Sequence, residues 1–170
     1  MYQSGHQGAA MLFFAPLGFL LAFVGGLSAA IVGFVAAAAL ASLPDQDLRV
    51  PFIKHRGITH TVWFALVTGL VLGAFGALIG AQQGLILGLA LGVLGFLTGC
   101  LTIISHIAAD AITPMGVRPL APMSSKKIVK PIARAKNPIA NYALLGIGYA
   151  VAIAATGAGV MVRSVVGGLV

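Results

Sequence analysis

The stretch MLFFAPLGFLLAFVGGLSAAIVGFVAAAALASL, residues 11–43, is apolar along its whole length and contains no charged residue. A membrane-spanning helix needs about 20 apolar residues, whereas one straight helix over this stretch would reach roughly 50 Å at ~1.5 Å per residue. Gly25 and Gly26 interrupt the stretch, and Ser28 is a residue type that caps helix N-termini. The stretch therefore predicts two short antiparallel helices that form a hairpin, over about 8–24 and 28–43.

The rest of the sequence contains three further apolar stretches that are long enough to cross a membrane. The predicted helices run over about 59–79, 85–112 and 138–161. Glycines recur at four-residue spacing in the first two, for example Gly69 and Gly73, which predicts close helix packing. The 170-residue chain is 59% hydrophobic and 8% charged, with a mean hydropathy of +1.06, which excludes a water-soluble globular protein. We therefore expect an all-α integral membrane protein with about five membrane helices in one membrane domain, residues 1–170.

The net charge of +7 is concentrated in two loops. Nine of the ten basic residues lie there: Arg49, Lys54, Arg56, Arg118, Lys126, Lys127, Lys130, Arg134 and Lys136. The positive-inside rule predicts that both loops are cytoplasmic, including the long basic loop 113–137, in which residues 126–136 are expected to form a short surface helix. The five-helix path then places the N-terminus inside and the C-terminus outside. Such loops also attract anionic membrane lipids. We expect a protein of the plasma or inner membrane with no nucleic-acid partner.

The acidic residues and most of the histidines gather in two short segments at the ends of apolar stretches. LPDQDLRVPFIKHRGITHT, residues 43–61, holds Asp45, Asp47, His55 and His60. SHIAADAITP, residues 105–114, holds His106 and Asp110, and the chain contains no glutamate. A carboxylate in so apolar a chain is costly unless another group compensates it. Carboxylates clustered with imidazoles are typical of a divalent metal site.

The positions of these residues on the predicted helices favour the same interpretation. His106 and Asp110 are four residues apart, so they share one helix face. A carboxylate at a helix C-terminus is unfavourable by about 0.3–1 kcal/mol, and a divalent cation compensates for it. His60 begins a predicted helix, where the dipole favours the neutral imidazole that binds metals. One or two divalent ions are therefore expected among Asp45, Asp47, His60, His106 and Asp110, with His55 and His6 as further ligands.

Two residues are candidates for direct roles in catalysis. Asp47 could act as a base if the metal does not occupy it, and Arg56 could bind an anionic group such as a phosphate. Arg56 could equally serve only as a positive anchor of the loop. Thr59, Thr61 and Ser105 could orient the ligands, although a helix cap or a packing role is more usual for such residues.

The ordered motifs of the chain resemble a known family. They are LPD-x-D from Leu43, HRG-x-TH from His55 and SH-x3-D-x2-TP-x-GV from Ser105, with Gly-His at residues 5–6. This pattern, over roughly residues 5–122, is similar to the LexA-regulated, membrane-bound metal-dependent hydrolase family. The resemblance implies a small multi-spanning membrane protein with metal-dependent hydrolase activity and does not identify a substrate. Some members carry an acidic residue near the start of the last helix, where this chain reads PIANY at residues 138–142.

The function expected from the sequence is hydrolysis at the cytoplasmic membrane face by a divalent metal. Zinc is the first expectation, with manganese, iron and magnesium as alternatives, and the substrate is small or lipidic, such as a lipid or a phosphoester. The alternatives are a metal-ion transporter or sensor, and a structural membrane protein with a metal tether. Transporter sites tend to lie near the membrane midplane on broken helices. The candidate ligands here lie at helix ends, which argues against transport.

Overall fold

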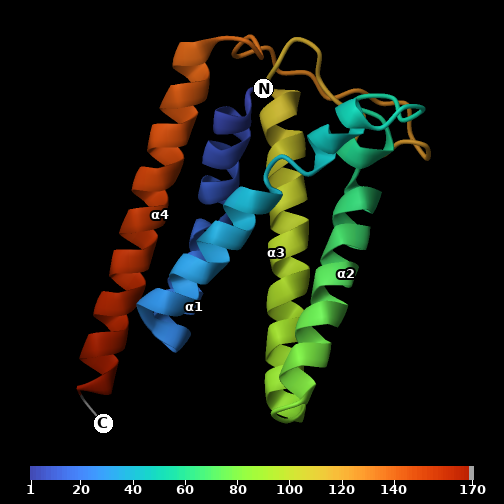
Figure 1. Ribbon diagram of the computed structural model, residues 1–170. Helices are drawn as coiled ribbons and strands as arrows, with labels where there is room; N and C mark the ends of the chain where they lie inside the picture. The colour runs from blue at the N-terminus through green and yellow to red at the C-terminus, as the bar shows by residue number, and fades with distance from the viewer. Residues whose placement is uncertain (169–170) are drawn as a thin grey trace.

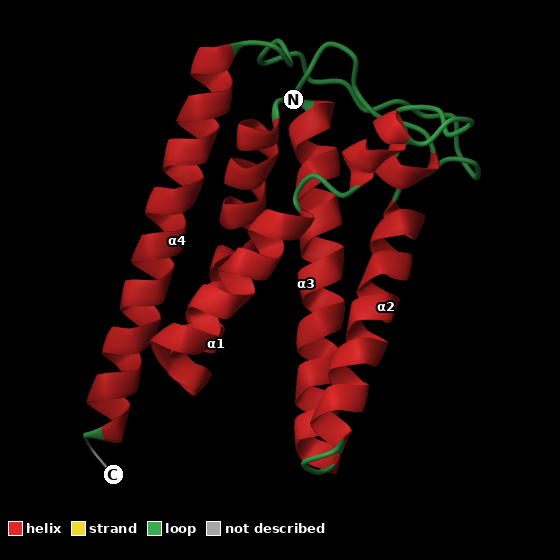
Figure 2. Ribbon diagram, viewed as in Figure 1, coloured by secondary structure: helices red, strands yellow, loops and turns green. Residues whose placement is uncertain are grey.

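The computed structural model describes residues 1–168 and is helical apart from loops and one isolated bridge (Figures 1 and 2). Its α-helices are α1 (Gln3–Leu40), α2 (Val62–Ala81), α3 (Leu85–Ala111) and α4 (Pro138–Gly167). Two short 3-10 helices, η1 (Pro44–Arg49) and η2 (Ile58–His60), lie between α1 and α2. In this described part, four helices are long and apolar enough to cross a membrane. The structure therefore has the all-helical membrane architecture that the composition predicts.

Helix α1 is broken at Gly26 and folds back on itself. Gly26 has φ 80° and ψ −175°, a conformation that glycine adopts without steric cost. The rings of Phe14 and Phe34 meet edge to face with centroids 5.2 Å apart, and residues from both arms share one buried apolar cluster. The predicted break and hairpin are confirmed. The two arms are counted together among the four candidate spans of the described chain, so the expected total of five membrane helices stays a prediction. At ~1.5 Å per residue the second arm, residues 27–40, is only about 21 Å long, less than the ~30 Å of a hydrocarbon core.

Helices α2 and α3 form a second antiparallel pair whose backbones approach closely through glycines. A Cβ on Gly99 would lie 2.8 Å from the Cα of Gly69, and a Cβ on Gly73 would lie 3.0 Å from the carbonyl oxygen of Gly92. The glycine spacing in the sequence predicts this contact. Helix α4 packs mainly against α1, and α1 also contacts α3. Two helix pairs therefore stand side by side and meet between α1 and α3.

The segments that carry the candidate ligands lie together at one end of the molecule. Figure 1 shows the N-terminus, the segment between α1 and α2 and the loop between α3 and α4 at the same end, opposite the α2–α3 turn. The side of the membrane that this end faces stays a prediction. The surface helix expected over 126–136 is wrong, because that backbone bonds elsewhere: Ile128 pairs with Val117, and the N–H of Lys130 donates to the carbonyl of Ala111 at 2.7 Å.

Candidate metal centre

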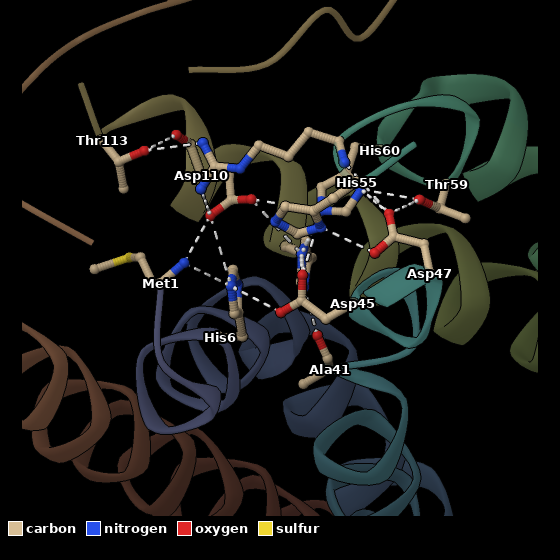
Figure 3. A network of polar contacts seen from close by, with 12 residues as sticks. Met1, His6, Ala41, Asp45, Asp47, His55, Thr59, His60, Asp110 and Thr113 are labelled. Carbon is tan, nitrogen blue, oxygen red and sulfur yellow. Dashed lines mark hydrogen bonds and ion pairs between the residues drawn. The ribbon is translucent and has the colours of Figure 1, made fainter. Parts of the chain in front are cut away.

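Side chains from four segments meet between the ends of α1 and α3 (Figure 3). His6 comes from α1, Asp45 from η1, His60 from η2, and His106 and Asp110 from the last turns of α3. The three histidines are fully buried and Asp110 is 1% exposed, whereas Asp45 is 22% exposed. The fold thus brings together groups that are spread over the first 110 residues of the chain.

Local structure fixes the direction of each of these segments. Pro44 stands at the first position of η1, directly before Asp45, so the turn after α1 starts at a residue with a preset φ. His60 is the last residue of η2, and the Thr61 hydroxyl that follows accepts the N–H of Phe64 at 3.3 Å as the N-cap of α2. The cap keeps His60 outside the helix. Its ring therefore points across to α3 rather than along α2.

Four ligand atoms form the inner part of the site. The Nε2 atoms of His60 and His106 are 3.1 Å apart, and each lies 3.4 Å from Oδ1 of Asp45. Oδ2 of Asp110 lies 3.5 Å from Nε2 of His60 and 3.9 Å from Nε2 of His106. Ligand atoms about 2.0–2.1 Å from a tetrahedral zinc ion are roughly 3.3 Å from one another. The spacing of the two imidazole nitrogens from each other and from each carboxylate oxygen, 3.1–3.9 Å, is therefore close to that around a single zinc-sized ion.

Hydrogen bonds on the far side of both rings fix their tautomers. Nδ1 of His106 lies 2.7 Å from the carbonyl oxygen of Ala41, which can only accept, so this nitrogen carries the proton. Nδ1 of His60 lies 3.0 Å from the Thr59 hydroxyl, which donates its own proton to Asp47 at 2.7 Å. This Nδ1 is therefore a donor as well. The two Nε2 atoms then face each other with lone pairs, and a cation between them removes the repulsion.

Asp110 has one oxygen that is fully paired and one that is not. Oδ1 accepts a hydrogen bond from the Met1 ammonium and forms an ion pair with Nη2 of Arg56, both at 2.8 Å. Oδ2 is buried without a hydrogen-bond partner and faces the Nε2 atoms of the two histidines. A buried acceptor without a partner costs about 1–3 kcal/mol, and more when it is charged. A divalent ion would satisfy this oxygen and both imidazoles together.

Asp47 lies behind the histidines rather than among the four inner atoms. Its Oδ1 accepts from Nδ1 of His55 at 2.9 Å, and its Oδ2 accepts the Thr59 hydroxyl and the backbone N–H of Arg56. The carboxylate is fully buried and faces the Nδ1 side of His60 at 3.5 Å. A carboxylate in this position orients metal-binding imidazoles. The structure thus places Asp47 away from the point where the Nε2 atoms meet.

Arg56 is likewise engaged with the protein itself. Nη2 contacts Asp110, and Nη1 donates to the Thr113 hydroxyl at 3.2 Å and to the carbonyl of Gly116 at 3.0 Å. The side chain is 9% exposed, and the backbone has φ 60°, which is uncommon for a residue other than glycine. Arg56 therefore ties the segment before α2 to the end of α3. Its two terminal nitrogens contact protein groups rather than open space.

His6 and His55 flank the inner atoms on two sides. The ring of His6 stacks on His106 with centroids 3.6 Å apart, and its Nε2 lies 3.6 Å from Oδ2 of Asp45. His55 is 34% exposed and meets the ring of His60 edge to face at 5.2 Å. The site divides into two groups whose ligand atoms lie within 4.8 Å of one another: His6, Asp45, His106 and Asp110 in one, and Asp45, His55 and His60 in the other.

Sequence reasoning missed three contributors to the site. The carbonyl of Ala41 fixes the tautomer of His106, but a backbone group leaves no signal in the sequence. Thr113 is fully buried, and its hydroxyl accepts a hydrogen bond from Nη1 of Arg56. It is the threonine of the TP-x-GV motif, which is the sequence feature that points to it. The Met1 ammonium contacts Asp110 and His6.

The three threonine and serine candidates have different partners. Thr59 forms a hydrogen bond with the candidate ligand His60, whereas Thr61 caps α2 and the Ser105 hydroxyl donates to the carbonyl of Thr102.

Comparison with known proteins identifies a family that matches almost the whole chain. The model of a family described as YdjM inner membrane protein matches residues 8–169. No curated protein and no solved structure matches the chain. The family description agrees with the four apolar helices and establishes a membrane location. That description states a location and no reaction.

Proposed function

The chain belongs to the YdjM inner membrane protein family, and we propose that it is a metal-dependent hydrolase whose site lies at one end of the helix bundle. One observation carries this proposal. Two imidazole Nε2 atoms, on His60 and His106, face each other at 3.1 Å beside the unpaired Oδ2 of Asp110. These three groups, with Asp45, would hold a divalent ion. The motif resemblance to LexA-regulated metal-dependent hydrolases supports the assignment and implies expression under LexA control.

The donor set favours zinc over the alternatives. Imidazole nitrogens and carboxylate oxygens at tetrahedral spacing suit zinc, and manganese or iron would accept the same set. Magnesium prefers oxygen ligands in an octahedral arrangement, which a site with several histidines does not provide. A divalent ion held there supplies Lewis acidity and makes water a nucleophile near neutral pH.

The residues around the ligands prepare the site and exclude water from most of it. Asp47 and Thr59 hold His55 and His60 in place, and Arg56 holds Asp110. These positions keep the Nε2 atoms and the free carboxylate oxygen directed at one point. Within the ligand set, Asp45 and His55 are the members with substantial exposure, at 22% and 34%. We propose that substrate approaches on this side and that water replaces the alcohol of an ester at the ligand cluster.

The surface beside this opening favours a substrate from the membrane interface. The segment between α1 and α2 exposes Leu48, Phe52 and Ile58, with Phe52 fully exposed, and it also carries Arg49 and Lys54. Large apolar side chains next to basic ones are suited to a lipid surface with anionic head groups. We therefore propose membrane lipids as partners and a small or lipidic ester or phosphoester as substrate. By the positive-inside rule, the basic loops support a cytoplasmic location for this end.

A structural metal tether is the second candidate, and burial is the observation that favours it. Four of the candidate ligands are almost fully buried and come from three different segments, as in closed structural sites: His6, His60, His106 and Asp110. Such an ion would join the segments and catalyse nothing. A transporter or sensor has less support, because every candidate ligand lies at one end of the bundle rather than at its middle.

Metal content and turnover of the detergent-purified protein test the proposal. The wild-type protein should retain at least one divalent ion per chain, and Asp110→Asn should lose most of it. Para-nitrophenyl butyrate and bis(para-nitrophenyl) phosphate serve as ester and phosphoester probes, before and after chelation and metal return. Gln46→Ala is the matched control, because Gln46 is exposed between the two aspartates. If metal-loaded protein hydrolyses neither probe, the structural tether would replace the hydrolase as the proposed function.

A further inference from the structure

We infer that the site holds two divalent ions joined by Asp45, and that its substrate is a phosphate ester. This inference rests on the proposed function and makes it more specific. It starts from the number of donors. Four histidines and two aspartates converge, whereas a zinc ion takes four ligands. A single ion would leave two donors without a role.

The donors divide into two groups that share one residue. His6, His106 and Asp110 surround one position together with Asp45, and His55 and His60 surround the other with the same Asp45. The first position has three buried ligands besides Asp45. The second has three ligands, of which His55 is 34% and Asp45 22% exposed, so it keeps an open place for water or substrate.

Asp45 is arranged to serve both positions. Its Oδ2 lies 3.6 Å from Nε2 of His6, on the side of the first group. Its Oδ1 lies 3.4 Å from Nε2 of His60, in the second group, and also 3.4 Å from Nε2 of His106, in the first group. Oδ2 therefore faces the first group, and Oδ1 lies where the two groups meet. The 3.1 Å contact between His60 and His106 brings the two groups next to each other.

His55 is the residue that distinguishes two ions from one. Its Nδ1 lies 2.9 Å from Asp47, a buried carboxylate, so the proton sits on Nδ1 and the Nε2 lone pair is free. One of its ring nitrogens lies within 4.8 Å of a carboxylate oxygen of Asp45 and of a ring nitrogen of His60. Asp47 thus prepares His55 for coordination in the same way that Thr59 prepares His60.

The charge of a doubly loaded site points to a phosphate ester. The chain has three side-chain carboxylates, all in this region, and Arg56 already pairs with one of them. Two divalent ions bring more positive charge than these carboxylates neutralise, so a loaded site would attract an anion. Paired ions about 3.5–4 Å apart are typical of enzymes that cleave phosphate esters. A neutral carboxylic ester would gain much less from such a site.

Metal counting and magnetic resonance on the detergent-solubilised full chain test the two-ion site. Protein stripped by chelation and reloaded with Mn²⁺ should bind two ions per chain and show an electron paramagnetic resonance signal of a coupled pair. His55→Gln should bind one ion and show an isolated Mn²⁺ signal. Gln46→Ala, altered at an exposed residue outside both groups, should keep two coupled ions. Size-exclusion profiles of all three proteins report whether they stay folded.

The outcomes separate this inference from the proposed function. One ion per wild-type chain overturns the pair but leaves a metal-dependent hydrolase, whereas no bound ion overturns both. Two coupled ions in His55→Gln would exclude His55 as a ligand and overturn the assignment. With both ions bound, bis(para-nitrophenyl) phosphate should be cleaved in preference to para-nitrophenyl butyrate. The reverse preference would overturn the substrate class.

Discussion

At the scale of single residues, the site is organised in two layers that have different tasks. The inner layer consists of imidazole and carboxylate atoms that face one point. The outer layer consists of groups that hold the inner ones: Asp47, Thr59, Arg56 and the carbonyl of Ala41. The two buried carboxylates differ in pairing: Oδ2 of Asp110 has no hydrogen-bond partner, whereas both oxygens of Asp47 accept hydrogen bonds. This difference separates Asp110, a proposed ligand, from Asp47, a proposed support.

Asp47→Asn tests the outer layer. The amide keeps the volume of the side chain but weakens the acceptor that orients His55 and, through Thr59, His60. We expect metal affinity to fall by about 10–100-fold, the usual effect of losing such a support. Competition with a chromogenic chelator measures the affinity. Asp110→Asn should lose more affinity than Asp47→Asn; the opposite order would place Asp47 among the ligands.

At the scale of helices, close backbone contact places the ligands. His60 stands just before α2, and His106 lies on α3, so the distance between them depends on how closely these two helices pack. Glycines at the contact allow that approach: a Cβ on Gly99 would come within 2.8 Å of the backbone of Gly69. Gly99 lies two turns before His106 on α3, so both residues are on the same face of that helix.

Gly99→Leu tests this dependence. The added side chain has no room against α2, and overpacking of this kind costs about 1–3 kcal/mol. The separation of the helices should also move His60 away from His106, so bound metal should decrease. Gly146→Leu on α4 is the control, because a Cβ at Gly146 meets nothing within 4 Å. Thermal unfolding and metal analysis of both variants measure the two effects. If Gly99→Leu binds as much metal as the wild-type protein, the distance between His60 and His106 does not depend on this contact.

At the scale of the whole molecule, the candidate ligands gather at one end of the bundle. The segments that carry the ligands and both basic loops lie there, opposite the α2–α3 turn (Figure 1). The two helix pairs contact each other mainly through α1 and α3. An ion held by α1, η1, η2 and α3 would therefore join the pairs at the end where the loops leave the bundle.

The orientation of this end is open to direct measurement. Single cysteines at Gln82 and Ser125, both exposed, in a Cys100→Ser background should react with impermeant reagents from opposite sides. The basic residues predict that Ser125 is cytoplasmic. Labelling of intact cells and of inverted vesicles distinguishes the two sides. Reaction of both positions from the same side would contradict the predicted orientation.

Metal removal should lower the stability of the whole fold. Because an ion bound to the folded state stabilises it by mass action, free metal at 100 times its dissociation constant contributes about 2.7 kcal/mol. Chelation should lower the thermal unfolding midpoint, and return of Zn²⁺ should restore it. Acidification should act in the same direction as chelation, since protons compete for the same imidazoles and carboxylates. A midpoint that chelation leaves unchanged would mean that the ligand cluster holds no ion in the purified protein.

The amino-acid sequence by itself determined the helical membrane class, the break at Gly26 and the residues of the cluster. Each of these follows from local properties: the length of apolar stretches, glycine conformation, and the rarity of carboxylates in an apolar chain. The glycine spacing also predicted the α2–α3 contact. The surface helix over 126–136 failed because residues distant in the sequence supply that backbone with hydrogen-bond partners.

Only the tertiary structure decided where each member of the cluster lies relative to the others. Asp45 and Asp47 are two residues apart and chemically identical, yet one faces the imidazole Nε2 atoms and the other faces the Nδ1 side. Arg56 reads as a free cation in the sequence and is held by Asp110, Thr113 and Gly116 in the fold. The direction of a side chain depends on contacts between segments that are far apart in the chain. Those contacts, and with them the division between ligand and support, exist only once the helices have packed.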